Sequence, residues 1–211
     1  PFLTASWDIE CFSMTGDFPL PRRTWAKAAK ELYELARSGE HAIELVLTSL
    51  SVGQNPVETL PKGMTPIYCS LKKRAEVIRA EMKQVKYYAE WEAILARKDR
   101  DTTEEVIERI VKALEKQFKN SVVLQGDPCI QIGTTLTRGT VETTERHLFV
   151  FPDCAPIPGI EVHSYPTEGA MILGWFEWMA ERSPDILIGY NVFGFDEAYV
   201  WHRAEELKIL T

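Results

Sequence analysis

A strand carrying two acidic side chains lies near the start of the chain and constrains the fold more than any other segment. From Phe2 to Cys11 the residues alternate, so that one face is apolar and consists of Leu3, Ala5, Trp7, Ile9 and Cys11. Asp8 and Glu10 lie side by side on the opposite face, where like charges repel. A divalent cation would offset that repulsion. The simpler alternative is a solvent-exposed sheet face.

The middle of the chain has a helical composition. Residues from about 22 to 120 are rich in Ala, Glu, Lys, Leu and Arg, and they predict helices over Arg22–Ser38, Glu40–Leu50, Ser70 to about Arg97, and from Thr102 or Thr103 to about Phe118. Ser70 and Thr102 or Thr103 are the expected N-caps. Residues 54–66 contain three prolines and predict a loop.

Strand patterns return from Gly126. They predict an antiparallel hairpin of Cys129–Leu136 with Arg146–Phe151 and a short strand over Ile160–Ser164. A helix over Thr167–Arg182, a buried strand over Asp185–Tyr190 and a last helix over Phe195–Leu207 follow. This order predicts an α/β fold, a mixed sheet flanked by helices. We expect residues 1–19 and 126–211 to form its core and residues 20–125 to form an all-helical insertion.

Composition narrows the class of protein. No apolar run approaches the roughly 18–20 residues of a membrane span, and the four cysteines form no C-x-x-C pair, which favours reduced thiols in an intracellular protein. The formal net charge of −7 is distributed unevenly along the chain, because residues 20–125 hold 19 basic and 15 acidic residues and are therefore net basic. Because the chain begins with Pro1, we expect it to be a piece of a longer protein.

A third carboxylate follows the last predicted strand. The segment Gly189–Asp196 turns from that strand into a helix, and Asp196 falls in the first helical turn. A capping carboxylate favoured by the helix dipole is one interpretation. The other is a metal ligand, because Asp8, Glu10 and Asp196 together offer the hard oxygen donors that suit Mg²⁺ or Mn²⁺ in a two-metal phosphodiesterase.

Three segments in order resemble a known family. D-I-E-C at 8–11, G-D-P-C-I-Q-I-G-T-T-L at 126–136 and P-D-I-L-I-G-Y-N-V-F-G-F-D at 184–196 are similar to the 3′→5′ proofreading exonuclease domain of family B DNA polymerases. The residues around these segments are most similar to those in polymerases of large double-stranded DNA viruses. The resemblance covers about half of the chain, residues 1–19 and 126–211.

The resemblance implies an RNase H-like fold that hydrolyses the 3′-terminal phosphodiester of a mispaired primer during DNA replication. It implies that Asp8, Glu10 and Asp196 are catalytic and hold two Mg²⁺ or Mn²⁺ ions, and that Asn191 and Phe195 contact the single-stranded 3′ end. Implied partners are DNA and the remaining polymerase domains, with a sliding-clamp processivity factor as a further one, at the intracellular site of viral DNA replication. We interpret Tyr199 as helix packing and Arg203 as a surface charge.

One family element is missing. No residue here matches the third exonuclease motif, a Tyr followed four residues later by an Asp. We therefore expect the chain to bind metal weakly and to hydrolyse DNA poorly or not at all by itself. The alternatives are a catalytically inactive DNA-binding or scaffolding module with the same fold, and a free-standing nuclease.

Basic clusters and histidines are the two remaining groups of residues that could bear on function. The basic clusters Lys72-Lys73-Arg74 and Arg97-Lys98-Arg100 could follow a DNA backbone. We favour a solvated helical face of mixed charge, because acidic residues are interleaved with each cluster or follow it. The four histidines are scattered, and packing is the default interpretation of His147 and His163, which fall in predicted strands.

Overall fold

The computed structural model describes residues 1–53, 59–139 and 144–210 of the chain. It divides into two compact units. The first, here called the sheet unit, consists of Pro1–Arg22 and Gly126–Thr211, and the second, the helix-rich unit, consists of Arg23–Gln125.

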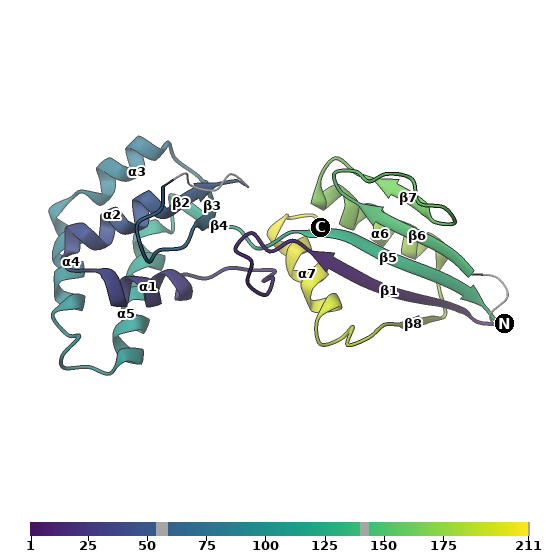
Figure 1. Ribbon diagram of the computed structural model, residues 1–211, viewed down its shortest axis with the longest axis horizontal. Helices are drawn as coiled ribbons and strands as arrows, with labels where there is room; N and C mark the ends of the chain where they lie inside the picture. Colours follow the sequence, from purple (N-terminus) through teal and green to yellow (C-terminus); the bar gives the residue numbers. More distant parts are fainter. Residues whose placement is uncertain (54–58, 140–143, 211) are drawn as a thin grey trace. The chain divides into compact units, whose positions relative to one another are not determined.

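The sheet unit is built on a five-stranded mixed sheet with the order β7-β6-β5-β1-β8 (Figure 1). Strand β1 (Leu3–Cys11) pairs antiparallel with β5 (Cys129–Arg138) and parallel with β8 (Ile186–Ile188). Strand β6 (Thr144–Val150) pairs antiparallel with β5 and parallel with β7 (Glu161–Ser164). The predicted hairpin and the predicted mixed sheet are confirmed.

Two helices, α6 (Glu168–Arg182) and α7 (Asp196–Glu206), complete the unit. Thr167 caps α6 by accepting a hydrogen bond from the Ala170 backbone N–H at 3.1 Å. Trp175 of α6 packs against Trp7 of β1 with ring centroids 4.8 Å apart. The apolar face of β1 is therefore the one that meets the helices, as its alternation predicts, and Asp8 and Glu10 lie on the opposite face.

The expectation that residues 185–190 form a buried strand is only half right. Ile186–Ile188 is a strand, but its three side chains are exposed by 42%, 53% and 48%. The reason is its position, because β8 is the last strand of the order and pairs with β1 alone within the described residues. An apolar run cannot distinguish an edge strand from a central one.

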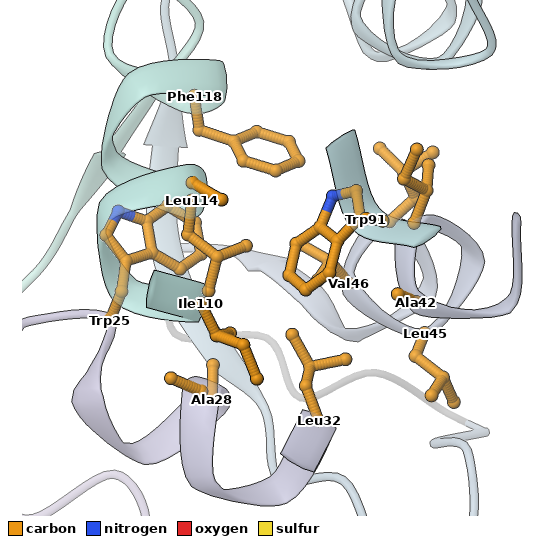
Figure 2. Packing of buried hydrophobic residues seen from close by; sticks show 14 of the residues in the cluster. Trp25, Ala28, Leu32, Ala42, Leu45, Val46, Trp91, Ile110, Leu114 and Phe118 are labelled. Atoms are coloured by element: carbon orange, nitrogen blue, oxygen red, sulfur yellow. The ribbon is translucent and has the colours of Figure 1, made fainter. Parts of the chain in front are cut away.

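The helix-rich unit has a core of its own (Figure 2). Large side chains from several helices meet there, among them Leu32, Trp91, Leu114 and Phe118, all of them almost fully buried. Its helices are α1 (Ala26–Leu35), α2 (Gly39–Ser49), α3 (Ala75–Met82), α4 (Val85–Leu95) and α5 (Thr103–Phe118). Thr102 and Glu105 form a capping box that starts α5, which confirms the predicted cap.

The prediction that this region is all-helical is wrong. It contains a three-stranded sheet of order β2-β3-β4, formed by Leu50–Val52, Ile67–Leu71 and Val122–Leu124. Ser70 lies in β3 opposite Val123 and is not a helix cap, and the single long helix expected after it is two helices, α3 and α4. Strands this short carry too few residues for a period-2 pattern to be recognised. Residues 54–58 of the expected loop lie outside the described residues.

Candidate active site

Asp8 and Glu10 lie on the solvent-facing side of β1. Both are exposed, and Gly133 and Gln131 of β5 are their respective partners in the sheet register. A Cβ placed on Gly133 would meet no atom within 4 Å, so the space beside Asp8 is open. Both carboxylates are therefore accessible to a ligand from the same side of the sheet.

Asp196 reaches β1 from the start of α7. Its Oδ1 accepts a hydrogen bond from the Ile9 backbone N–H at 3.2 Å, and the residue is only 3% exposed. Burial raises the pKa of the Asp196 carboxyl, and the neighbouring Asp8 carboxylate adds to this, while hydrogen bonds from backbone N–H groups, including that of Ile9, act in the opposite direction. The structure thus brings two of the three predicted ligands together in a site where negative charge is unfavourable.

A tight turn between β8 and α7 makes this approach possible. The Asn191 carbonyl accepts hydrogen bonds from the backbone N–H groups of Gly194 and Phe195, at 2.9 and 3.0 Å. Asn191 has a positive φ of 53°, a conformation that Asn tolerates better than most residues. A Cβ on Gly194 would lie 2.3 Å from the Asn191 Oδ1, so a larger residue at this position would force the Asn191 side chain to move.

The three carboxylates do not form one compact cluster. Among the described residues, the single group of three ligand side chains close enough to share one ion is His147, Glu161 and His163, not the predicted acidic trio. Asp8 and Asp196 are neighbours, whereas Glu10 lies two residues farther along β1 on the same face. The oxygen donors and the unfavourable burial of negative charge fit a hard divalent cation at this pair. The assignment of all three residues as ligands stays a prediction.

A groove of about 510 Å³ adjoins Asp8. Its lining includes Gly133, Arg146 and Tyr190, and Tyr190 is 95% exposed. Arg146 and Tyr190 escaped the sequence reasoning. Their positions along β6 and after β8 could have indicated them only once the strand order was known, because Arg146, Thr135 and Ser6 lie in one row across the sheet.

The other residues singled out from the sequence have mixed outcomes. Phe195 is half-buried and packs against Phe18 and Tyr199, with ring centroids 5.4 and 5.2 Å away, while Asn191 is exposed. Tyr199 is buried, and its hydroxyl donates to the Asp127 carbonyl at 2.9 Å, in agreement with a packing role. DNA contact by Asn191 and Phe195 stays a prediction.

The interpretation of Arg203 as a surface charge is wrong. The residue is 4% exposed, and its guanidinium donates to both carboxylate oxygens of Glu168, at 2.8 and 2.7 Å. It also donates to Glu206 at 2.7 Å and to the Pro21 carbonyl at 3.1 Å. Burial alone would lower the pKa of Arg203, but its carboxylate partners outweigh burial and raise it. A helical periodicity places Arg203 on the buried face of α7, which is the signal that could have revealed this.

The basic clusters of the helix-rich unit are engaged within that unit. Lys73 forms an ion pair with Glu81 at 2.7 Å, and Arg97 forms one with Asp101 at 2.5 Å. Lys98 donates to the Tyr33 carbonyl. These contacts favour the solvated mixed-charge face over a dedicated DNA-binding surface.

Comparison with known proteins agrees with the sequence motifs. Residues 64–211 match the family model of the DNA polymerase family B exonuclease domain. The DNA polymerase of Pyramimonas orientalis virus is 30% identical over 98% of this chain and 20% of its own length. The DNA polymerase delta catalytic subunit of Oryza sativa subsp. japonica is 41% identical over 40% of this chain and 8% of its own length.

The matches are confined to a part of each relative. The DNA polymerase of Acanthamoeba polyphaga mimivirus, for example, is 41% identical over 36% of this chain and 4% of its own length. The chain spans a fifth or less of the length of these three relatives. In the part of the chain that the structure describes, no helix is both long and apolar enough to span a membrane.

Proposed function

Because the chain belongs to the exonuclease domain of DNA polymerase family B, we propose that it is the 3′→5′ proofreading nuclease part of such a polymerase. Its substrate would be the 3′-terminal phosphodiester of a mispaired primer. The observation that carries this proposal is the placement of Asp196 against β1 beside Asp8, where burial and like charge call for a cation. We further propose that residues 1–19 and 126–211 are the nuclease core and residues 20–125 an insertion in it.

This domain family implies the use of divalent metal, and the oxygen donors at this site suit Mg²⁺ or Mn²⁺. Asp8, Glu10 and Asp196 would hold two such ions. When bound, the ions would lower the pKa of an attacking water and stabilise the leaving oxygen. The chain itself orients Asp196 through the Ile9 N–H, and keeps Asp8 and Glu10 on the open face of β1.

The groove beside Asp8 would receive the frayed 3′ end. Asn191 and Phe195 would contact the last nucleotides, and the exposed ring of Tyr190 offers a surface on which a base can stack. Arg146 places a guanidinium in the same groove, where it would pair with a phosphate. Besides DNA, the proposed partners are the remaining domains of a polymerase, with a sliding clamp expected from the resemblance alone.

The test is degradation of a 5′-labelled primer with a mispaired 3′ nucleotide, in Mn²⁺ and in EDTA. It uses this chain and a version extended through the third motif, each with an Asp8→Ala counterpart. Mn²⁺-dependent shortening by single nucleotides, abolished by Asp8→Ala, supports the proposal. DNA binding with no hydrolysis by either version would instead indicate a scaffolding module.

A further inference from the structure

Three potential metal ligands converge on strands β6 and β7 of the sheet unit. His147 lies on β6, and Glu161 and His163 lie on β7. The parallel register pairs His147 with Glu161 and Phe149 with His163, so all three side chains leave the sheet on the same face. One ligand atom from each lies within 4.8 Å of the other two.

The separations of these atoms match a coordination site. His147 Nδ1 is 3.2 Å from His163 Nε2 and 3.5 Å from Glu161 Oε2, and His163 Nε2 is 3.6 Å from Glu161 Oε1. Three corners of a tetrahedron around Zn²⁺, with metal–ligand bonds of about 2.0–2.2 Å, are about 3.3–3.6 Å apart. The two Glu161 distances involve different carboxylate oxygens. A turn of this carboxylate, with small adjustments of the two imidazoles, would therefore be needed to bring one atom from each residue into bonding distance of one ion.

The surroundings of His147 also suit a ligand. Its second nitrogen, Nε2, faces Glu145 Oε2 at 3.4 Å. Histidines that bind metals usually donate their other N–H to a carboxylate in this way, which fixes the ring orientation. His147 is 4% exposed, and its ring packs on that of Trp178 with centroids 4.6 Å apart. The Arg182 guanidinium is directed to Glu145, at 3.8 Å, and to the Trp178 ring, neither of which is one of the three ligands.

This cluster is separate from the proposed nuclease site. Trp7, Thr134, His147 and Glu161 form one row across the sheet, and Trp7 and Thr134 both contact Trp175 of α6. The cluster therefore lies on the helix-covered face, opposite Asp8 and Glu10. Its donors also differ in kind, because two imidazoles and one carboxylate suit Zn²⁺ rather than Mg²⁺.

We propose that His147, Glu161 and His163 form a second metal site, selective for Zn²⁺ or a similar transition-metal ion. Solvent reaches the site from the Glu161 side, where the side chain is 64% exposed, and water would complete the coordination. Strand β7 has only four residues and lies at the edge of the sheet. Bound metal would therefore fasten β7 to β6 and stabilise this edge.

The test is a titration with Co²⁺, a spectroscopic substitute for Zn²⁺, in excess Mg²⁺. The protein should show visible absorption bands of four-coordinate Co²⁺, which Zn²⁺ abolishes, and its thermal midpoint should rise with Zn²⁺. Glu161→Gln, at an exposed residue, and His163→Gln should each lose the bands. Glu145→Gln should weaken Co²⁺ binding by about tenfold. Glu177→Gln, on the exposed side of α6, is the charge-matched control and should behave as wild type.

An Asp8→Ala protein separates this site from the nuclease site. It should keep the Co²⁺ bands in full. Wild-type protein without the bands, or Glu161→Gln and His163→Gln proteins that keep them, would overturn the proposal and leave His147 and His163 as a hydrogen-bonded pair. Near-UV circular dichroism of each variant establishes that it is folded.

Discussion

Replacement of Arg203 by methionine is predicted to destabilise the sheet unit strongly. The change removes the paired hydrogen bonds to Glu168, the hydrogen bond to Glu206 and the hydrogen bond to the Pro21 carbonyl. Glu168 is 7% exposed, so its carboxylate would remain buried without its cation, and within the described part of the chain the Cys129 N–H would be its remaining donor. Removal of one partner of such a buried pair costs about 3–5 kcal/mol of the free energy of unfolding.

Arg22→Met is the matched control for this change. Arg22 forms an ion pair with Glu205 on the same helix as Arg203, but its side chain is 49% exposed. An exposed pair contributes about 0.2–1 kcal/mol, so the control should lose little stability. Both variants are compared by urea denaturation followed by tryptophan fluorescence, with near-UV circular dichroism as a second probe.

A double variant identifies the cause of the loss. Arg203→Met combined with Glu168→Gln removes the orphaned charge and keeps an oxygen that can accept from the Cys129 N–H, so it should recover a large part of the stability lost in Arg203→Met. Equal unfolding free energies for Arg203→Met and Arg22→Met, within about 1 kcal/mol, would refute the reasoning. A double variant less stable than Arg203→Met would do the same.

Three further predictions concern titration, DNA binding and thiol chemistry. The raised pKa of Asp196 means that the folded state holds the Asp196 proton more tightly than the unfolded state does, so stability falls as pH rises through that pKa. Without metal, thermal denaturation should therefore show Asp196→Asn to be more stable than wild type at pH 7 but not at pH 3. Arg146→Ala should weaken binding of single-stranded DNA and reduce its salt dependence by about one phosphate contact, whereas an equal effect of Lys112→Ala, a surface cation paired with Glu108, would contradict a specific role. Burial raises the pKa of the Cys69 thiol to about 11, so about a thousandth of the Cys69 side chains are thiolate at pH 8. Iodoacetamide should therefore label Cys154 well before Cys69 in the folded protein, which peptide mapping would show.

Local patterns predicted the parts of the fold that local chemistry determines. The alternation around Asp8 gave the strand and its two faces, Thr102 gave the start of α5, and Thr167 gave the start of α6. Each of these signals depends on residues within a few positions of one another. The turn that carries Asn191 and places Asp196 at a helix start was predictable for the same reason.

The features that were missed depend on contacts between distant segments. The strand around Ser70 exists because it pairs with β4, some fifty residues later in the chain. Burial of Arg203 depends on Glu168, 35 positions away, and the exposure of β8 depends on its place at the end of the strand order. His147 and His163 are neighbours only because β6 and β7 are parallel and in register. Apart from the helical periodicity that places Arg203 on the buried face of α7, none of these relations leaves a periodic signal in the sequence.

The most direct test of the proposed active site is Mn²⁺ binding measured by electron paramagnetic resonance. Wild-type protein should reduce the signal of free Mn²⁺, and Mg²⁺, which shares the preference for oxygen ligands, should restore it. Asp196→Asn should lose this Mg²⁺-displaceable binding, because the variant keeps the hydrogen bond to Ile9 but not the charge. Equal Mg²⁺-displaceable binding by wild type and Asp196→Asn would contradict the assignment of the Asp8 and Asp196 pair as the metal site.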